Sequence, residues 1–196
     1  LQQIPKAGSG PGAKIRECFV APKGSKILVA DYSQCELRIL AELSQDPVFI
    51  DAYANNKDLH TETASRIYKV PLNEVTKAQR NISKTINFAL VYGGGAQTVA
   101  ARTGISKEEA NELIGNYFNA YKKIKEYLDT SSKDAVMYRY SKTILGRKRF
   151  YELPRVDHPD FNRIKGSVER EGRNHCVQGC NADITKQAII YLHEEL

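Results

Sequence analysis

Hydrophobic and polar positions recur with the period of an α-helix over most of the chain, and most clearly over residues 76–93. Within this stretch, polar and aromatic side chains fall at every fourth position: Arg80, Lys84, Phe88 and Tyr92. A step of four residues drifts by only about 40° around a helix, so these side chains form one slowly turning stripe. Thr76 is a suitable N-cap, and the three glycines at 93–95 favour an end to the helix. We therefore predict a helix with cations at one end of its stripe and aromatic rings at the other.

The rest of the pattern predicts further helices, one strand and one hairpin. Lys26–Tyr32 is a short apolar run between turn residues, which indicates a buried strand, and Ile15–Val20 is short enough to pair as a second one. Ser33 with Glu36 three residues later has the capping-box pattern, which predicts that a helix starts at this serine. Further helices are expected at 34–44, 46–55, 60–68, 97–102, 106–117, 121–138 and 160–195, the last interrupted at Gly179, and a hairpin at 140–153 whose tip carries Arg147, Lys148 and Arg149.

These elements predict an α+β fold that is mostly α-helical. The 196 residues, 41% of them hydrophobic, suffice for one large domain. The chain has no run of eighteen apolar residues and no signal-peptide pattern at its start, so we expect no membrane partner. We expect a cytoplasmic protein, with an organelle as the alternative. The first residue is Leu1 rather than Met, which is typical of a fragment or a processed product.

Charge and cysteine content narrow the classes of partner. A net charge of +6 indicates an anionic partner, although 23 acidic residues exclude a purely polycationic tail. Of the four cysteines, Cys176 and Cys180 have C-x3-C spacing, but no second Cys/His pair lies near them in the sequence. We therefore expect reduced thiols rather than a zinc site.

Two stretches together indicate chemistry on a nucleotide. Asp31 ends the predicted strand beside a turn, where a carboxylate can hold Mg²⁺, and the Tyr32 carbonyl would add an oxygen ligand. The stripe's cations suit phosphate oxygens, and its aromatic rings suit a base or sugar. A metal on one side of a triphosphate and cations on the other favour phosphoryl-type transfer. Taken alone, the helix is better interpreted as amphipathic with a solvated basic face, and the aspartate as a structural residue at a helix start.

The residues resemble a known family at this point. Asp31–Leu40 resembles motif A, and Arg80–Gly93 resembles motif B (R-x3-K-x3-F-x3-YG), of family A DNA polymerases, the bacterial DNA polymerase I group. Further stretches resembling that family's palm and fingers are LQQIP at 1–5, KDLHTETA at 57–64, LGRKRF at 145–150 and R-x3-N-x3-QG at 170–179. The resemblance implies part of a right-hand palm with a helical fingers subdomain. Its expected parts are palm with motif A at 1–45, fingers at 46–155 and a return to the palm at 156–196.

The resemblance also implies template-directed DNA synthesis and a role for each matching residue. Asp31 would be a catalytic, metal-binding carboxylate of a two-Mg²⁺ site, assisted by the Tyr32 carbonyl, and Lys84 would neutralise or protonate the leaving pyrophosphate. Glu36 would exclude a 2′-hydroxyl. The residues implied to bind the deoxynucleoside triphosphate (dNTP) are Ser33, Gln34, Glu36, His60, Arg80, Lys84, Phe88 and Tyr92. Those implied to contact primer–template DNA are Arg170, Asn174 and Gln178.

The second metal-binding carboxylate of the family lies in a later motif C, which the sequence does not reach before Leu196. We therefore expect residues 1–196 alone to bind nucleotide and DNA weakly and to polymerise negligibly. A C-terminal polypeptide with motif C is an expected partner. It would cover apolar residues of the last helix, namely Ile184, Ile189, Ile190 and Leu192.

Two other functions remain open on the sequence. A single-subunit RNA polymerase shares the R-x3-K and YG pattern, but Glu36 argues against it because ribonucleotides need a small residue there. A non-catalytic module that binds primer–template DNA, or a degenerate remnant, is the other alternative. A DNA-only binder would be insensitive to dNTP and Mg²⁺, and its affinity would fall steeply with salt.

Overall fold

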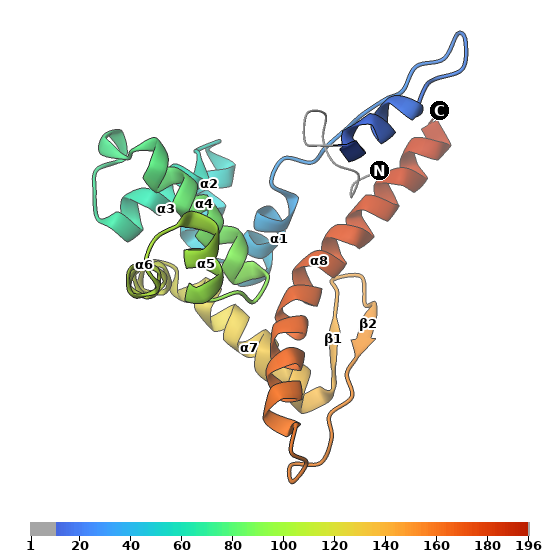
Figure 1. Cartoon of the computed structure of the whole chain (residues 1–196). Helices are drawn as coiled ribbons and strands as arrows, with labels where there is room; N and C mark the ends of the chain where they lie inside the picture. The colour runs from blue at the N-terminus through green and yellow to red at the C-terminus, as the bar shows by residue number, and fades with distance from the viewer. Residues whose placement is uncertain (1–10, 196) are drawn as a thin grey trace. The chain divides into compact units, whose positions relative to one another are not determined.

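The computed structural model describes residues 11–195 and divides into two compact units, Leu1–Ser33 and Gln34–Leu196. The described part of the first unit begins with a 3₁₀ helix, η1 (Pro11–Cys18), and continues as extended chain with a turn closed by a hydrogen bond from Ser25 N to Pro22 O. In Figure 1 the described part of this unit is blue. The LQQIP stretch at 1–5 lies outside the described residues.

Neither strand predicted in the first unit forms. η1 occupies most of residues 15–20, and Lys26–Tyr32 is irregular, with Ile27, Leu28 and Val29 exposed to 56%, 75% and 85%. A strand needs neighbours that pair its backbone groups and cover its side chains. No part of residues 11–195 pairs with this run, because the described chain forms one sheet, made of β1 and β2.

The second unit is mostly helical with one small sheet, as predicted (Figure 1). Its elements are α1 (Cys35–Ser44), α2 (Pro47–Ala54), α3 (Leu59–Tyr68), η2 (Leu72–Glu74), α4 (Lys77–Val91), α5 (Ala96–Thr103), α6 (Lys107–Ala120), α7 (Lys122–Tyr138), β1 (Tyr140–Lys142), β2 (Lys148–Phe150) and α8 (Phe161–Glu195). Most predicted helix ends lie within a few residues of these bounds. Among the described residues, no helix combines the length and apolarity needed to cross a membrane.

The capping pattern in the sequence predicted the start of α4 correctly but not the start of α1. α4 begins with the predicted Thr76 cap, whose side chain and that of Gln79 form a reciprocal capping box. α1, in contrast, begins after Gln34 in the left-handed region (φ 54°), and the described residues provide no side-chain cap for it. The predicted capping box at Ser33 is therefore wrong, because this residue precedes the N-cap position by one.

Helices α1 to α7, together with Val177 and Cys180 of α8, enclose the main hydrophobic core. Its largest fully buried side chains include Phe49, Tyr117 and Tyr121. The ring centroids of Phe49 and Tyr121 lie 5.0 Å apart at an interplanar angle of 84°, an edge-to-face arrangement. This aromatic centre fixes α2 against the junction of α6 and α7.

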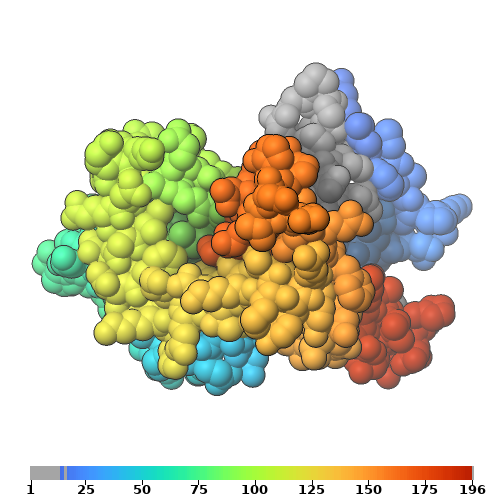
Figure 2. Space-filling view, turned by 90° about the horizontal axis from the view of Figure 1, so that it is seen from below, coloured from blue at the N-terminus to red at the C-terminus, as the bar shows by residue number. Residues whose placement is uncertain are grey.

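The hairpin and α7 pack along the first half of α8. β1 and β2 pair antiparallel, with Tyr140 opposite Phe150, and Figure 2 shows the hairpin (light orange) next to α7 (yellow). α8 continues through Gly179, so the predicted interruption is wrong. The glycine instead permits close packing, because a Cβ there would lie 2.6 Å from Thr143 Cγ2. The four apolar residues expected to be exposed near the end of α8 are exposed: Ile184, Ile189, Ile190 and Leu192.

The α7–α8 crossing depends on a second glycine, Gly172. A Cβ at this position would lie 2.2 Å from Ala135 Cβ, so the two helices touch where neither has room for another methyl group. We expect Gly172→Ala to lower the free energy of unfolding by about 1–3 kcal/mol, measured by urea denaturation. Gly115→Ala is the matched control, since Gly115 is exposed in α6 with nothing near a new Cβ, and it should stabilise by about 0.5–1 kcal/mol. An equal effect of both substitutions would contradict this packing.

Candidate functional site

The candidate site lies along one side of α4. The rings of Phe88 and Tyr92 have centroids 6.4 Å apart and planes 16° apart, so they stack one turn from each other. The His60 ring, from α3, lies 5.9 Å from the Phe88 ring. Lys84 is exposed one turn before Phe88, and within residues 11–195 it takes part in no ion pair. The structure thus brings the predicted cation, the two aromatic rings and the imidazole together.

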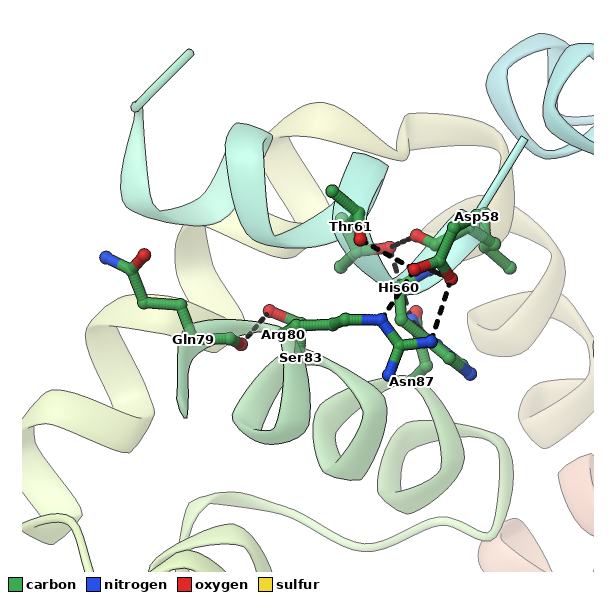
Figure 3. A network of polar contacts seen from close by, with 9 residues as sticks. Asp58, His60, Thr61, Gln79, Arg80, Ser83 and Asn87 are labelled. Atoms are coloured by element: carbon green, nitrogen blue, oxygen red, sulfur yellow. Dashed lines mark hydrogen bonds and ion pairs between the residues drawn. The ribbon is translucent and has the colours of Figure 1, made fainter. Parts of the chain in front are cut away.

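Arg80, the other cation of the stripe, is held by Asp58 (Figure 3). Arg80 Nε lies 2.5 Å from Asp58 Oδ2 and Nη2 lies 3.2 Å from Oδ1, a two-pronged ion pair between α4 and the start of α3. Asp58 is also the N-cap of α3 and accepts hydrogen bonds from His60 N and Thr61 Oγ1. Partial burial raises the pKa of Asp58, but the hydrogen bonds from Arg80 and Thr61 outweigh it and lower that pKa to about 2.

His60 is a buried side chain, with 3% of its surface exposed. Its Nδ1 lies 3.1 Å from Asn87 Nδ2 on α4 (Figure 3). Burial lowers the pKa of His60 to about 4, and the charges of Arg80 and Lys84 act in the same direction against that of Asp58. The imidazole is therefore neutral at pH 7.

A hydrogen bond joins the end of α4 to the start of α1. The Tyr92 hydroxyl donates to a carboxylate oxygen of Glu36, so two residues from separate motifs meet. Burial, followed by the hydrogen bond to Glu36, raises the pKa of Tyr92 to about 12, while a hydrogen bond with Gln178 of α8 opposes this shift. Three helices therefore converge at this hydroxyl group.

The three residues expected to contact DNA lie four residues apart on α8. Arg170 and Gln178 are exposed, whereas Asn174 is partly buried and its Oδ1 has no hydrogen-bond partner in the described chain. Arg170 lies against the glycines after α4, since a Cβ at Gly93 would be 3.0 Å from Arg170 Cβ. The backbone at Gly93 has φ 73°, so this contact and this conformation both favour glycine.

The motif A residues divide between the two units. Asp31, Tyr32 and Ser33 are exposed residues of the first unit. Gln34 opens the second unit, and its Oε1 accepts a hydrogen bond of 3.1 Å from the Tyr53 hydroxyl. The site geometry above is accordingly that of the second unit alone.

The donor set at Asp31 suits a hard cation. A carboxylate and the Tyr32 backbone carbonyl are oxygen ligands, which Mg²⁺ prefers, and Mg²⁺ is commonly held by one or two carboxylates together with substrate phosphates. Over residues 11–195 no group of three or more His, Cys, Asp or Glu side chains is arranged to hold a metal ion. The residues present thus fit part of a magnesium site that substrate oxygens would help to complete.

Sequence reasoning missed two residues that shape the site, Asp58 and Asn87. Asp58 precedes the predicted helix at 60–68 in an N-cap position, and this pattern could have identified it. Asn87 is a polar residue on the apolar side of α4, beside the buried Ile86 and Leu90. A buried polar residue of this kind needs hydrogen-bond partners. Its place among apolar residues could therefore have identified Asn87 from the sequence.

Comparisons with known proteins agree on one family. The family pattern of DNA polymerase family A matches residues 1–196. DNA polymerase I of Borreliella burgdorferi is 41% identical over 195 residues, covering 100% of this chain and 21% of that protein. DNA polymerase I of Pseudomonas aeruginosa is 38% identical over 190 residues, covering 97% of this chain and 20% of that protein. The chain thus spans about a fifth of the length of these curated relatives.

A solved structure agrees with the sequence relatives. The POL domain of Pol1 from M. smegmatis, in complex with DNA primer-template and dNTP, matches with a TM-score of 0.82 at 35% identity. The match covers 100% of this chain and 34% of that chain. The predicted fold class, a mostly helical part of a polymerase domain, is therefore confirmed.

The lowered pKa of His60 predicts a pH dependence of stability. Because the folded-state value of about 4 lies below the ordinary 6.5, unfolding takes up a proton between these pH values. The neutral His60 therefore contributes to the free energy of unfolding. This contribution is fully present above pH 6.5 and is lost as pH falls towards 4, to a total of roughly 3 kcal/mol. Urea denaturation at a series of pH values gives the free energy of unfolding as a function of pH. Between pH 4 and 6.5 this free energy should change less steeply with pH for His60→Gln than for the parent. His193→Gln, at an exposed position of α8, should keep the parental slope; equal slopes in all three proteins would contradict the shift.

Proposed function

The chain belongs to DNA polymerase family A, and from this premise we propose that it supplies the dNTP-binding surface and part of the catalytic site for template-directed DNA synthesis. The observation that carries this proposal is the cluster on α4. An exposed lysine, two stacked aromatic rings and a neutral imidazole lie within two turns of one another. Such a surface offers charge to phosphates at one end and a flat apolar face to a sugar and base at the other.

In this proposal Lys84 and His60 hold the triphosphate, and Phe88 packs against the nucleotide. The primer 3′-hydroxyl loses its proton to solvent as its oxygen bonds to the α-phosphorus and the bond to the leaving pyrophosphate breaks. Lys84 neutralises the charge that develops on the pyrophosphate and donates a proton to it. Arg80 contributes positive charge beside Lys84, reduced by its ion pair with Asp58.

Asp31 and the Tyr32 carbonyl would hold Mg²⁺ beside Ser33 and Gln34. When bound there, the ion supplies positive charge that neutralises phosphate oxygens. The exposure of Asp31 supports this role, because its carboxylate is accessible to an ion. The second carboxylate of a two-metal site belongs, in the proposal, to a C-terminal polypeptide with motif C.

Glu36 and Tyr92 form the proposed sugar end of the site. Their hydrogen bond holds the carboxylate of Glu36 beside the aromatic stripe. A carboxylate fixed in this way leaves little room for a 2′-hydroxyl, which supports selection of deoxynucleotides. On α8, Arg170, Asn174 and Gln178 are proposed to contact primer–template DNA, and residues 1–45 and 156–196 to form palm around fingers at 46–155.

The first test is nucleotide affinity. We expect Lys84→Ala to weaken Mg²⁺–dNTP binding by about tenfold, corresponding to loss of roughly 1.4 kcal/mol from one charge-assisted contact, measured by isothermal titration calorimetry. Lys107→Ala is the matched control, because Lys107 is an exposed lysine at the start of α6. Similar affinities for both variants would remove Lys84 from the site.

The second test is primer extension, with and without the segment of a bacterial DNA polymerase I that contains motif C. Little extension is expected from the chain alone, and Mg²⁺-dependent extension from the mixture. Asp31→Ala should lower the extension rate of the mixture by at least about 1000-fold, because it removes a ligand of the metal that neutralises the phosphates. Full activity of Asp31→Ala would contradict the catalytic assignment. DNA binding that ignores dNTP, Mg²⁺ and this substitution would favour the non-catalytic module.

A further inference from the structure

Asn87 lies at the centre of a buried polar network between α3 and α4. It is fully buried, and its side-chain nitrogen Nδ2 lies 3.1 Å from His60 Nδ1 (Figure 3). The same nitrogen lies 3.2 Å from Thr63 Oγ1. Thr63 is also fully buried. Both hydrogens of the Asn87 amide group therefore have a partner within reach.

Thr63 determines which way this amide group points. Its hydroxyl donates its only proton to the carbonyl oxygen of Leu59, at 2.8 Å. The hydroxyl oxygen is left as an acceptor, and the Tyr121 hydroxyl donates to it at 3.1 Å. The third neighbour of Thr63 Oγ1 is the Asn87 amide group. Because this oxygen has no proton left to donate, the amide has to face it with its N–H donor, Nδ2.

The reversed amide is the less stable arrangement. In the observed orientation, one buried group of Asn87, the carbonyl oxygen Oδ1, has no partner in the described chain. Reversal would place the NH₂ group at that point, leaving two buried hydrogens unpaired, and would turn Oδ1 toward a hydroxyl whose proton is already used. Since an unpaired buried donor loses its hydrogen bonds to water without replacing them, the network favours the observed orientation.

The orientation of Asn87 in turn fixes His60. Because Nδ1 faces an N–H donor, it has to carry the lone pair, and a neutral ring then carries its proton on Nε2. We propose that Asn87 is a positioning residue that holds His60 as a neutral imidazole whose Nε2–H is the hydrogen-bond donor for the triphosphate. This inference rests on the proposed function for the identity of the acceptor, but the protonation pattern stands on the network alone.

A fixed donor suits a triphosphate better than a free imidazole. A ring protonated on Nδ1 alone would present a lone pair at Nε2 and repel phosphate oxygens. The ionisable groups around His60 are Asp58 at the start of α3, Arg80 and Lys84 on α4, and Tyr121 at the start of α7, joined through Thr63. Burial, supported by the two cations against Asp58, lowers the pKa of His60 and keeps the ring neutral, so this donor function is independent of pH over the physiological range.

The first experiment observes the ring directly. ¹⁵N NMR of the histidine-labelled chain distinguishes the two neutral forms, and His60→Gln identifies one of the four histidines. We expect the His60 signals to show Nε2 protonated and Nδ1 unprotonated from pH 8.5 down to about 5.5. A proton on Nδ1, or averaged signals of both neutral forms, would overturn the inference whatever the chain binds.

The second experiment replaces the donor by an acceptor. In Asn87→Asp, the carboxylate favours a proton on Nδ1 and accepts a hydrogen bond from it, which raises the His60 pKa, so that the imidazolium loses its Nε2 proton as pH rises. We expect dNTP affinity of this variant to fall about tenfold from pH 6.0 to 8.5 relative to the parent, measured by calorimetry with Mg²⁺ and dGTP. Asn81→Asp adds the same charge at an exposed position of α4 and should follow the parental pH profile.

The outcomes separate the inference from the proposed function. In a His60→Gln background, Asn87→Asp should add no pH dependence, because the side chain through which it acts is absent. A loss of affinity that is equal at every pH would mean that Asn87 is merely structural, and would overturn the inference. Failure of the parent chain to bind dGTP at any pH would overturn the triphosphate role and the proposed function with it, but would leave the NMR result unaffected.

Discussion

The contact between α3 and α4 is the constraint on which the candidate site depends. An ion pair between Asp58 and Arg80 holds one end of this contact, and the amide–imidazole bond between Asn87 and His60 holds the other. Lys84 lies between them on the outer side of α4, and the ring of His60 meets that of Phe88. Because both anchors are polar and specific in geometry, sliding α3 along α4 would break them together. These two anchors therefore set the position of α4 beside α3.

Local sequence rules predicted the helical part of the fold well. The Thr76 cap, the stripe on α4 and the hairpin at 140–153 follow from capping, periodicity and turn chemistry within a few residues. The errors arose where the outcome depends on distant neighbours. Lys26–Tyr32 has the composition of a strand but has nothing to pair with in the described chain, and Gly179 is a packing position rather than a break in its helix.

The site shows the same division between local and distant information. Spacing along α4 was enough to place Lys84, Phe88 and Tyr92 on one side, and the family motif added His60 and Glu36, which the structure brings beside them. The buried partners could not be obtained in this way. The contact of the Asn87 amide with the His60 imidazole depends on how α3 and α4 pack. Likewise, the spacing of Ser33 and Glu36 did not predict that Gln34 would adopt a left-handed conformation before α1.

The continuity of α8 would constrain the DNA contacts that we propose for this helix. Arg170, Asn174 and Gln178 belong to one uninterrupted helix of 35 residues, so neighbouring members of this set are separated by about 6 Å along its axis. Base pairs of duplex DNA are about 3.4 Å apart, so one interval on the helix spans nearly two of them. For a duplex lying along α8, an advance of one base pair does not carry a contacted base pair to the next side chain. All three contacts would therefore have to break and form again at each step, because the spacing of the side chains on α8 is larger than the spacing of the base pairs.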